Sequence, residues 1–147
     1  MKKEQPIKLE IFKPAQGNKT ELPFFSTKIS AGFPSPAEDF IEKKLDLNEY
    51  LIKNPSATFF IKVSGHSMKN AGIFDGDILV VDRSIEPSDN KIVIGVVNGE
   101  FTVKRLTKEN NKLYLMPENP DFKPLEINES MDVSVWGVVT YTIHKTR

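Results

Sequence analysis

The 147-residue chain has zero net charge, 39% apolar residues and no cysteine, a balance typical of one globular domain, alone or with a tail. Without cysteine there are no disulfides and no thiolate catalysis. With His66 and His144 as the only histidines, we expect no metal site and no cofactor. The charge balance argues against a strong positive field that would hold nucleic acid. No apolar stretch approaches the roughly 20 residues of a membrane helix, and no secretory signal is recognisable, which favours a cytoplasmic protein without membrane contact.

Residues 1–31 lack a sustained hydrophobic period, because short apolar clusters alternate with Pro, Gly, Asn and Lys. This pattern predicts an extended arm with one short strand at 7–12. A helix-turn-helix reader of DNA would need three helical patterns here, and the segment has none. We therefore expect no direct sequence-specific binding to DNA.

The next segment carries two signals for the start of a helix. The sequence SPAE at 35–38 offers serine as N-cap, proline at the first helical position and glutamate at the third, and the apolar stripe that follows runs through residue 45. Asp46 can cap a second short helix over 47–52, which the following Asn-Pro pair ends. We expect one or two short helices in this part of the chain.

From residue 57 onward the pattern changes to short runs rich in Val, Ile, Phe, Tyr and Thr, separated by turn residues. Closely spaced strands of this kind predict a compact, mostly antiparallel β domain. The predicted strands lie within 57–64, 77–82, 91–97, 100–106, 112–117 and 132–145.

The sharpest local feature is the pair Asn98-Gly99 between two of these runs, which predicts a hairpin with a two-residue type I′ turn. Such a turn fixes the register and therefore the side chains that share a face. Val93 is expected opposite Lys104, and Gly95 opposite Thr102. The face that holds Ile94 and Val103 would be core, whereas the other face combines apolar residues with Lys104.

A lysine on a partly apolar face of a central hairpin has two interpretations. Its methylenes can be buried while its ammonium reaches water. Alternatively, Lys104 is desolvated enough to be neutral near pH 7 and acts as a general base. Gly95, opposite Thr102, would leave space beside Lys104 for a second chain or a hydroxyl, which favours the second interpretation.

The motif VSGHSM at 63–68 suggests a serine nucleophile. His66 is a poor base for Ser67, because neighbours in an extended segment point to opposite faces and a base must lie within about 3 Å of the hydroxyl. The base must come from elsewhere in the chain. A Ser-His-Asp triad through His144 remains an alternative that no sequence motif supports.

Three motifs in order and at matching spacing resemble one known family: SGHSM at 64–68, DGDILVVD at 75–82 and GEFTVKRL at 99–106. They are similar to those of the serine–lysine self-cleaving proteins of the LexA/UmuD type, peptidase family S24. The similarity covers nearly everything from about residue 22 to the end and is strongest to the UmuD branch. It implies a compact antiparallel β domain of the LexA C-terminal and signal-peptidase type, with an extended N-terminal arm.

The resemblance assigns roles to residues of this sequence. It implies Ser67 as the nucleophile, Lys104 as the base and the Ala31-Gly32 bond as the bond that is cut. The backbone N–H groups of Ser67 and His66 would form the oxyanion hole. The chain would then divide into an arm, residues 1–31, and a peptidase and dimerisation domain, residues 32–147. His66 stands where the family often has an acidic residue, and Ala31 where UmuD-type proteins often have cysteine.

The same resemblance implies a function in the SOS response. RecA filaments on single-stranded DNA would stimulate self-cleavage, and the processed chain would form a homodimer and act as accessory subunit of an error-prone UmuC-type Y-family DNA polymerase. The alternative is a dimeric binding module that regulates such a polymerase without proteolysis. A LexA-class repressor would need a winged helix in the arm, and a signal peptidase would need a membrane anchor. Neither feature is visible in the sequence.

Overall fold

The computed structural model describes residues 10–15, 17, 19–25, 31–32 and 42–146. The chain divides into two compact units, one of residues 1–14 with 54–147 and the other of residues 15–53. The predicted helix start at 35–38 lies outside the described residues, as do positions 7–9 of the strand predicted at 7–12. Of the helices that the structure describes, none is long and apolar enough to cross a membrane.

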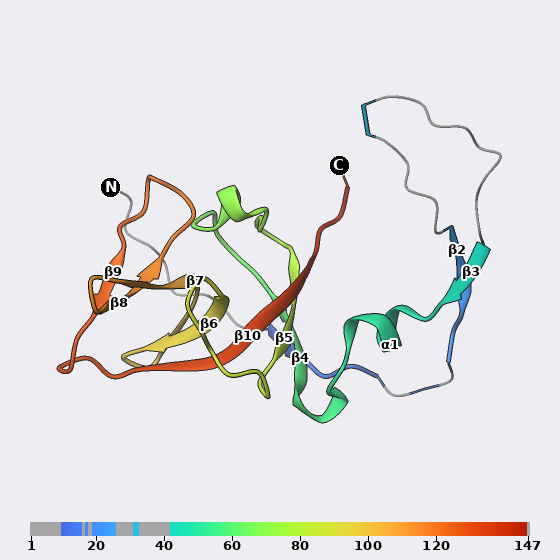
Figure 1. The fold of residues 1–147 in the computed structure, drawn as a ribbon, viewed down its shortest axis with the longest axis horizontal. Helices are drawn as coiled ribbons and strands as arrows, with labels where there is room; N and C mark the ends of the chain where they lie inside the picture. The colour runs from blue at the N-terminus through green and yellow to red at the C-terminus, as the bar shows by residue number, and fades with distance from the viewer. Residues whose placement is uncertain (1–9, 16, 18, 26–30, 33–41, 147) are drawn as a thin grey trace. The chain divides into compact units, whose positions relative to one another are not determined.

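The larger unit is built on one antiparallel sheet with the strand order β1-β4-β5-β10-β6-β7-β8-β9 (Figure 1). This confirms the mostly antiparallel β fold. The long strand β10, red in Figure 1, lies between β5 and β6 and joins the two halves of the sheet. The strands are β1 (Glu10–Phe12), β4 (Thr58–Lys62), β5 (Ile78–Asp82), β6 (Ile92–Val97), β7 (Glu100–Glu109), β8 (Lys112–Met116), β9 (Leu125–Ile127) and β10 (Val133–Ile143).

The hairpin between β6 and β7 has the predicted turn and register. Asn98 and Gly99 both have positive φ, 49° and 83°, as a type I′ turn requires. Val93 pairs with Lys104, and Gly95 pairs with Thr102. The local turn chemistry therefore places Lys104 in the interior of β7, five positions beyond the turn.

Both faces of the β6–β7 hairpin are covered. Ile94 and Val103 belong to one buried cluster, which also contains Met68 next to the candidate nucleophile. Val93 belongs to a second cluster, with Leu106, Leu115 and Val138. Since adjacent residues of a strand point to opposite faces, the sheet carries core on both sides.

The smaller unit holds β2 (Leu22–Phe25), β3 (Glu42–Leu45) and α1 (Leu47–Leu51). The prediction that a helix runs through residue 45 is wrong for 42–45, because this segment pairs with β2 as a strand. The second predicted helix is confirmed as α1. Asp46 caps it by accepting a hydrogen bond from the Glu49 N–H at 3.0 Å.

Candidate active site

Ser67 and Lys104, which lie 37 positions apart in the sequence, meet in the structure. The Nζ atom of Lys104 lies 3.3 Å from the Ser67 Oγ atom, at the outer edge of hydrogen-bond range. Ser67 belongs to the turn that follows β4, and Lys104 comes from the middle of β7. The predicted nucleophile and base are thus brought into contact.

The head group of Lys104 lies inside the protein. The residue is only 4% exposed, so the interpretation in which its ammonium reaches water is wrong. Its Nζ atom also donates to Thr102 Oγ1 at 2.6 Å and to the Val103 carbonyl at 3.0 Å. Burial disfavours the charged form of a lysine, whereas these acceptors hold its nitrogen in one position beside Ser67.

The expected space beside Gly95 is small. A Cβ atom added there would lie 3.4 Å from Leu115 Cδ1 and 3.6 Å from the methyl group of Thr102. The space beside Gly95 therefore admits a Cβ atom in ordinary contact with these neighbours. The hydroxyl that does lie beside Lys104 is that of Thr102, a residue that the sequence placed on the right face without assigning it a contact.

The loop that carries Ser67 is closed at its base by backbone hydrogen bonds. The Val63 N–H donates to the Asp77 carbonyl, and the Gly76 N–H donates to the Val63 carbonyl, each at 2.8 Å. Within the loop, the Gly65 N–H donates to Asp75 Oδ1 at 2.8 Å. The serine is therefore presented from a short, internally bonded loop.

A second segment, residues 118–119, holds the nucleophile from the side. The Glu118 N–H donates to the Ser67 carbonyl, and Asn119 Nδ2 donates to the His66 carbonyl, each at 2.8 Å. An ion pair between Glu118 and Arg105, the neighbour of Lys104 on β7, ties this segment to the strand of the candidate base. These contacts hold the His66–Ser67 and Ser67–Met68 peptide planes, which lie on either side of the Ser67 Cα atom.

Asn119 was not predicted from the sequence. It is buried, with 5% exposure, although it lies in a segment that the sequence presents as a turn between strands. Nothing in the single sequence distinguishes it from the asparagines of the other turns.

The N–H groups of His66 and Ser67 donate to no acceptor within the part of the chain that the structure describes. They can therefore point at a substrate oxygen, as an oxyanion hole requires.

The two histidines contribute in other ways. His66 is exposed, and its carbonyl is what Asn119 binds. His144 Nδ1 lies 2.6 Å from Asp77 Oδ1, at the base of the nucleophile loop. A His–Asp pair thus exists, but the side chain that contacts Ser67 is Lys104, which favours the dyad over the triad.

Ala31 and Gly32 are both exposed and belong to the 15–53 unit. The neighbouring segments 26–30 and 33–41 lie outside the described residues. An exposed peptide between small residues is sterically open to a nucleophile, because neither side chain shields the carbonyl.

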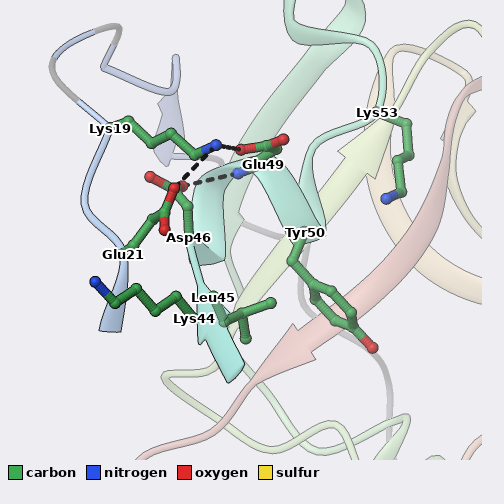
Figure 2. Close-up of a pocket in the computed structure, with 8 residues that line it drawn as sticks. All are labelled: Lys19, Glu21, Lys44, Leu45, Asp46, Glu49, Tyr50 and Lys53. Atoms are coloured by element: carbon green, nitrogen blue, oxygen red, sulfur yellow. Dashed lines mark hydrogen bonds and ion pairs between the residues drawn. The ribbon is translucent and has the colours of Figure 1, made fainter. Parts of the chain in front are cut away.

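The 15–53 unit also has an open surface hollow of about 290 Å³ (Figure 2). Lys19 forms ion pairs there with Glu21 and Glu49, each at 3.1 Å. The hydrogen bonds that Lys19 donates to Glu21, which has the larger effect, and to Glu49 raise the pKa of Lys19. Because these charges neutralise one another and neither Ser67 nor Lys104 lines the hollow, we place the candidate site at the Ser67–Lys104 contact.

The chain is similar in sequence to a family of peptidases and to several known proteins. Residues 23–140 match the family model described as Peptidase S24-like. The chain is 44% identical over 139 residues to Protein MucA of Escherichia coli, covering 93% of this chain and 94% of that protein. It is 47% identical over 126 residues to Protein ImpA of Shigella flexneri, with 85% of each chain covered. To the LexA repressor of Acidithiobacillus ferrooxidans it is 41% identical over 128 residues, which is 85% of this chain and 62% of the repressor.

Proposed function

The chain belongs to the S24-like peptidase family, as a UmuD-like member, and from this premise we propose that it cuts its own Ala31-Gly32 bond with a Ser67–Lys104 dyad. The observation that carries the proposal is the 3.3 Å contact between Lys104 Nζ and Ser67 Oγ, made by a lysine that is 4% exposed. A buried lysine is more easily neutral, and a neutral amine has a lone pair that can accept the serine proton.

In the proposed reaction, Lys104 Nζ accepts the Ser67 hydroxyl proton while Oγ attacks the carbonyl carbon of Ala31. The oxyanion that forms accepts hydrogen bonds from the N–H groups of His66 and Ser67. The Lys104 ammonium then donates its proton to the nitrogen of Gly32, and the bond between Ala31 and Gly32 breaks. Water then attacks the ester that joins the Ala31 carbonyl to Ser67 Oγ. Lys104 Nζ accepts a proton from this water and donates it to Ser67 Oγ as the ester bond breaks, which releases residues 1–31.

Presentation of the bond within one chain makes the attack effectively unimolecular, so a single-turnover reaction needs no finely built substrate pocket. The contacts of residues 118–119 with the His66 and Ser67 carbonyls support this step. The Asn119 contact holds the His66–Ser67 peptide plane, whose Ser67 N–H would bind the oxyanion, and the Glu118 contact holds the Ser67–Met68 plane that follows it.

The similarity to UmuD-like proteins also supports a proposal about what activates the cut in the cell and what the processed chain binds. We infer that RecA filaments on single-stranded DNA stimulate the cut during the SOS response. The processed chain, residues 32–147, would then form a homodimer and join a UmuC-type Y-family polymerase in translesion synthesis. Release of residues 1–31 would be the switch between the two states.

The test follows intact masses of the purified chain over time at about pH 10, where lysine deprotonates without an activator, and at about pH 7 with RecA filaments. Wild type and the matched control Ser64→Ala, an exposed serine of the same motif, should yield fragments 1–31 and 32–147. Ser67→Ala and Lys104→Ala should stay whole. Cutting of either variant would contradict the dyad. A wild type that stays whole even with RecA filaments would leave the non-proteolytic binding module as the function.

A further inference from the structure

Strand β1 joins two parts of the chain that the proposed cut would separate. It pairs antiparallel with β4, with Glu10 opposite Lys62, Ile11 opposite Ile61 and Phe12 opposite Phe60. β1 lies in the segment that the cut removes, whereas β4 lies in the segment that remains. Because β5 occupies the other side of β4, β1 alone covers the outer edge of β4 in the described sheet.

The backbone groups that β1 covers can be identified from the alternation of the ladder. The Val63 N–H points toward β5, since it donates to the Asp77 carbonyl at 2.8 Å. N–H and C=O groups alternate in direction along a strand, so those of Phe60 and Lys62 point toward β1. Their partners are Phe12 and Glu10, whereas the N–H of Ile11 points away from β4.

Side chains add a charge pattern to this edge. Glu10 and Lys62 face each other at one end of the pair. At the other end, Lys13 Nζ donates to the Ser56 carbonyl at 2.9 Å and lies 4.2 Å from the centre of the Phe59 ring. The edge therefore matches a strand that carries an acidic, an aliphatic, an aromatic and a basic residue in succession.

The contact is too small to keep β1 in place once the chain is cut. β1 has three residues, and the side chains of Ile11 and Phe12 are 43% and 49% exposed. While the chain is whole, the covalent link gives β1 a high effective concentration at the edge. After a cut this advantage is lost, and the separate fragment must also offset the entropy of association.

We propose that the edge of β4, uncovered when β1 leaves, is a docking site for an extended strand of a partner protein that takes the place of β1. The partner strand would place an acidic residue opposite Lys62, an aliphatic residue opposite Ile61 and an aromatic residue opposite Phe60. This mode of recognition adds a strand to a sheet, with main-chain hydrogen bonds for affinity and side chains for specificity. The proposal rests on the proposed function, because the cut after Ala31 is what would set β1 free.

A second copy of β4 does not meet these requirements. The strand reads TFFIK, with Lys62 as its charged residue and no acidic residue. In no antiparallel register within residues 58–62 would two copies of β4 place a carboxylate opposite Lys62. The charge pattern therefore favours a partner with its own acidic strand over self-pairing.

The test uses the full-length chain with Ser67→Ala, so that no cleavage takes part. Adding Phe12→Pro removes an N–H that faces β4 and opens the edge. Adding Ile11→Pro instead removes an N–H that faces away, which edge strands tolerate, and serves as the matched control. The probe is a fluorescent peptide with the sequence of residues 8–15, and fluorescence anisotropy reports binding. A second peptide exchanges the positions of its Glu10 and Lys13 side chains.

The first peptide should bind the Phe12→Pro chain at least about tenfold more tightly than the Ile11→Pro chain or the Ser67→Ala parent, and about tenfold more tightly than the exchanged peptide. Hydrogen exchange should accelerate at the Phe60 and Lys62 amides in the Phe12→Pro chain alone. Equal binding to all three chains, or no binding although these amides exchange faster, would overturn the proposal. If the Phe12→Pro chain instead forms a dimer, with twice the mass of one chain, and this dimer does not bind the peptide, the edge would be assigned to a second copy. Since none of these chains is cut, each result is independent of whether the dyad works.

Discussion

In the larger unit, Lys104 is 4% exposed and its Nζ atom contacts three oxygen atoms of Ser67, Thr102 and Val103. In the 15–53 unit, which holds Ala31 and Gly32, the ion pairs of Lys19 join side chains that are 39% to 68% exposed. Buried, satisfied polar contacts define one geometry, because any alternative leaves a polar group without a partner. Exposed ion pairs contribute little and are screened by salt.

The two regions thus differ in how strongly the sequence specifies them. The candidate chemistry is held by buried and partly buried contacts, from which water is largely excluded. The segment that would be cut lies in a unit whose ion pairs, among the residues that the structure describes, are exposed to water. This difference suggests that regulation acts on the presentation of the Ala31-Gly32 bond and leaves the dyad itself unchanged.

Lys104→Arg should reduce self-cleavage by about 100- to 10,000-fold, because arginine keeps the positive charge but does not lose its proton to act as a base. Lys108→Arg, an exposed position on the same strand, is the matched control and should cleave at the wild-type rate. Intact-mass time courses at about pH 10 give both rates. A Lys104→Arg chain that cleaves normally would show that charge alone, and not proton transfer, is what this position supplies.

Asn119→Ala should slow cleavage by roughly 10- to 100-fold, since the His66 carbonyl would lose its buried donor and the Ser67 N–H, in the same peptide plane, would lose its fixed direction. As a positioning residue it should leave the shape of the pH–rate profile unchanged. Asn128→Ala, at an exposed turn, is the control. A profile that shifts along the pH axis in Asn119→Ala would mean instead that this residue acts on the proton affinity of Lys104.

Asp82→Ala should lower the free energy of unfolding at pH 7 by about 1–3 kcal/mol, because Asn54 Nδ2 and the Ser84 N–H would lose a buried acceptor. Burial has the largest influence on the pKa of Asp82 and acts to raise it, but the hydrogen bonds from Asn54 and Ser84 together hold the pKa below its ordinary value. Its stabilisation is therefore present above the ordinary pKa of aspartate and is lost as the pH falls through the lower folded-state pKa. Urea unfolding at pH 7 and at about pH 3 should show the difference between variant and wild type shrinking in acid. A constant difference would contradict the assigned hydrogen bonds.

Asp46→Ala should affect overall unfolding less than Asp82→Ala, although the hydrogen bonds from the N–H groups of Glu49 and Thr20 also lower the pKa of Asp46. The reason is that these bonds are exposed and cap a short helix of the smaller unit. The expected result is a local change, with faster hydrogen exchange in α1 and unchanged exchange in β6 and β7. If β6 and β7 also exchanged faster, the two units would be energetically coupled, which would contradict the prediction.

The elements that could be predicted from the sequence are those with strong local chemistry. Asn98-Gly99 fixed a turn, and the turn fixed the register that places Lys104 opposite Val93. Asp46 could be assigned as a helix cap because its side chain needs only the next turn of the same helix. Contact between Ser67 and Lys104 was different. The resemblance to a family predicted it, since a spacing of 37 positions contains no information about proximity.

The features that escaped prediction depend on distant partners. Residues 42–45 satisfy a helical pattern, yet they form β3 because β2 offers a strand to pair with. β9 has three residues, too few for a period to be recognised, and exists through its pairing with β8. Asn119 looks like a turn residue until the fold brings the His66 carbonyl to it.

The role of Lys104 as the base can be measured as the pH–rate profile of self-cleavage for the wild type and Lys104→Ala, from about pH 6 to pH 11, without an activator. If neutral Lys104 is the base for Ser67, the wild-type rate should rise by about tenfold per pH unit and then level off at the pKa of this lysine, while Lys104→Ala shows no such rise. A wild-type rate that does not depend on pH, or a Lys104→Ala chain with the wild-type profile, would contradict the account.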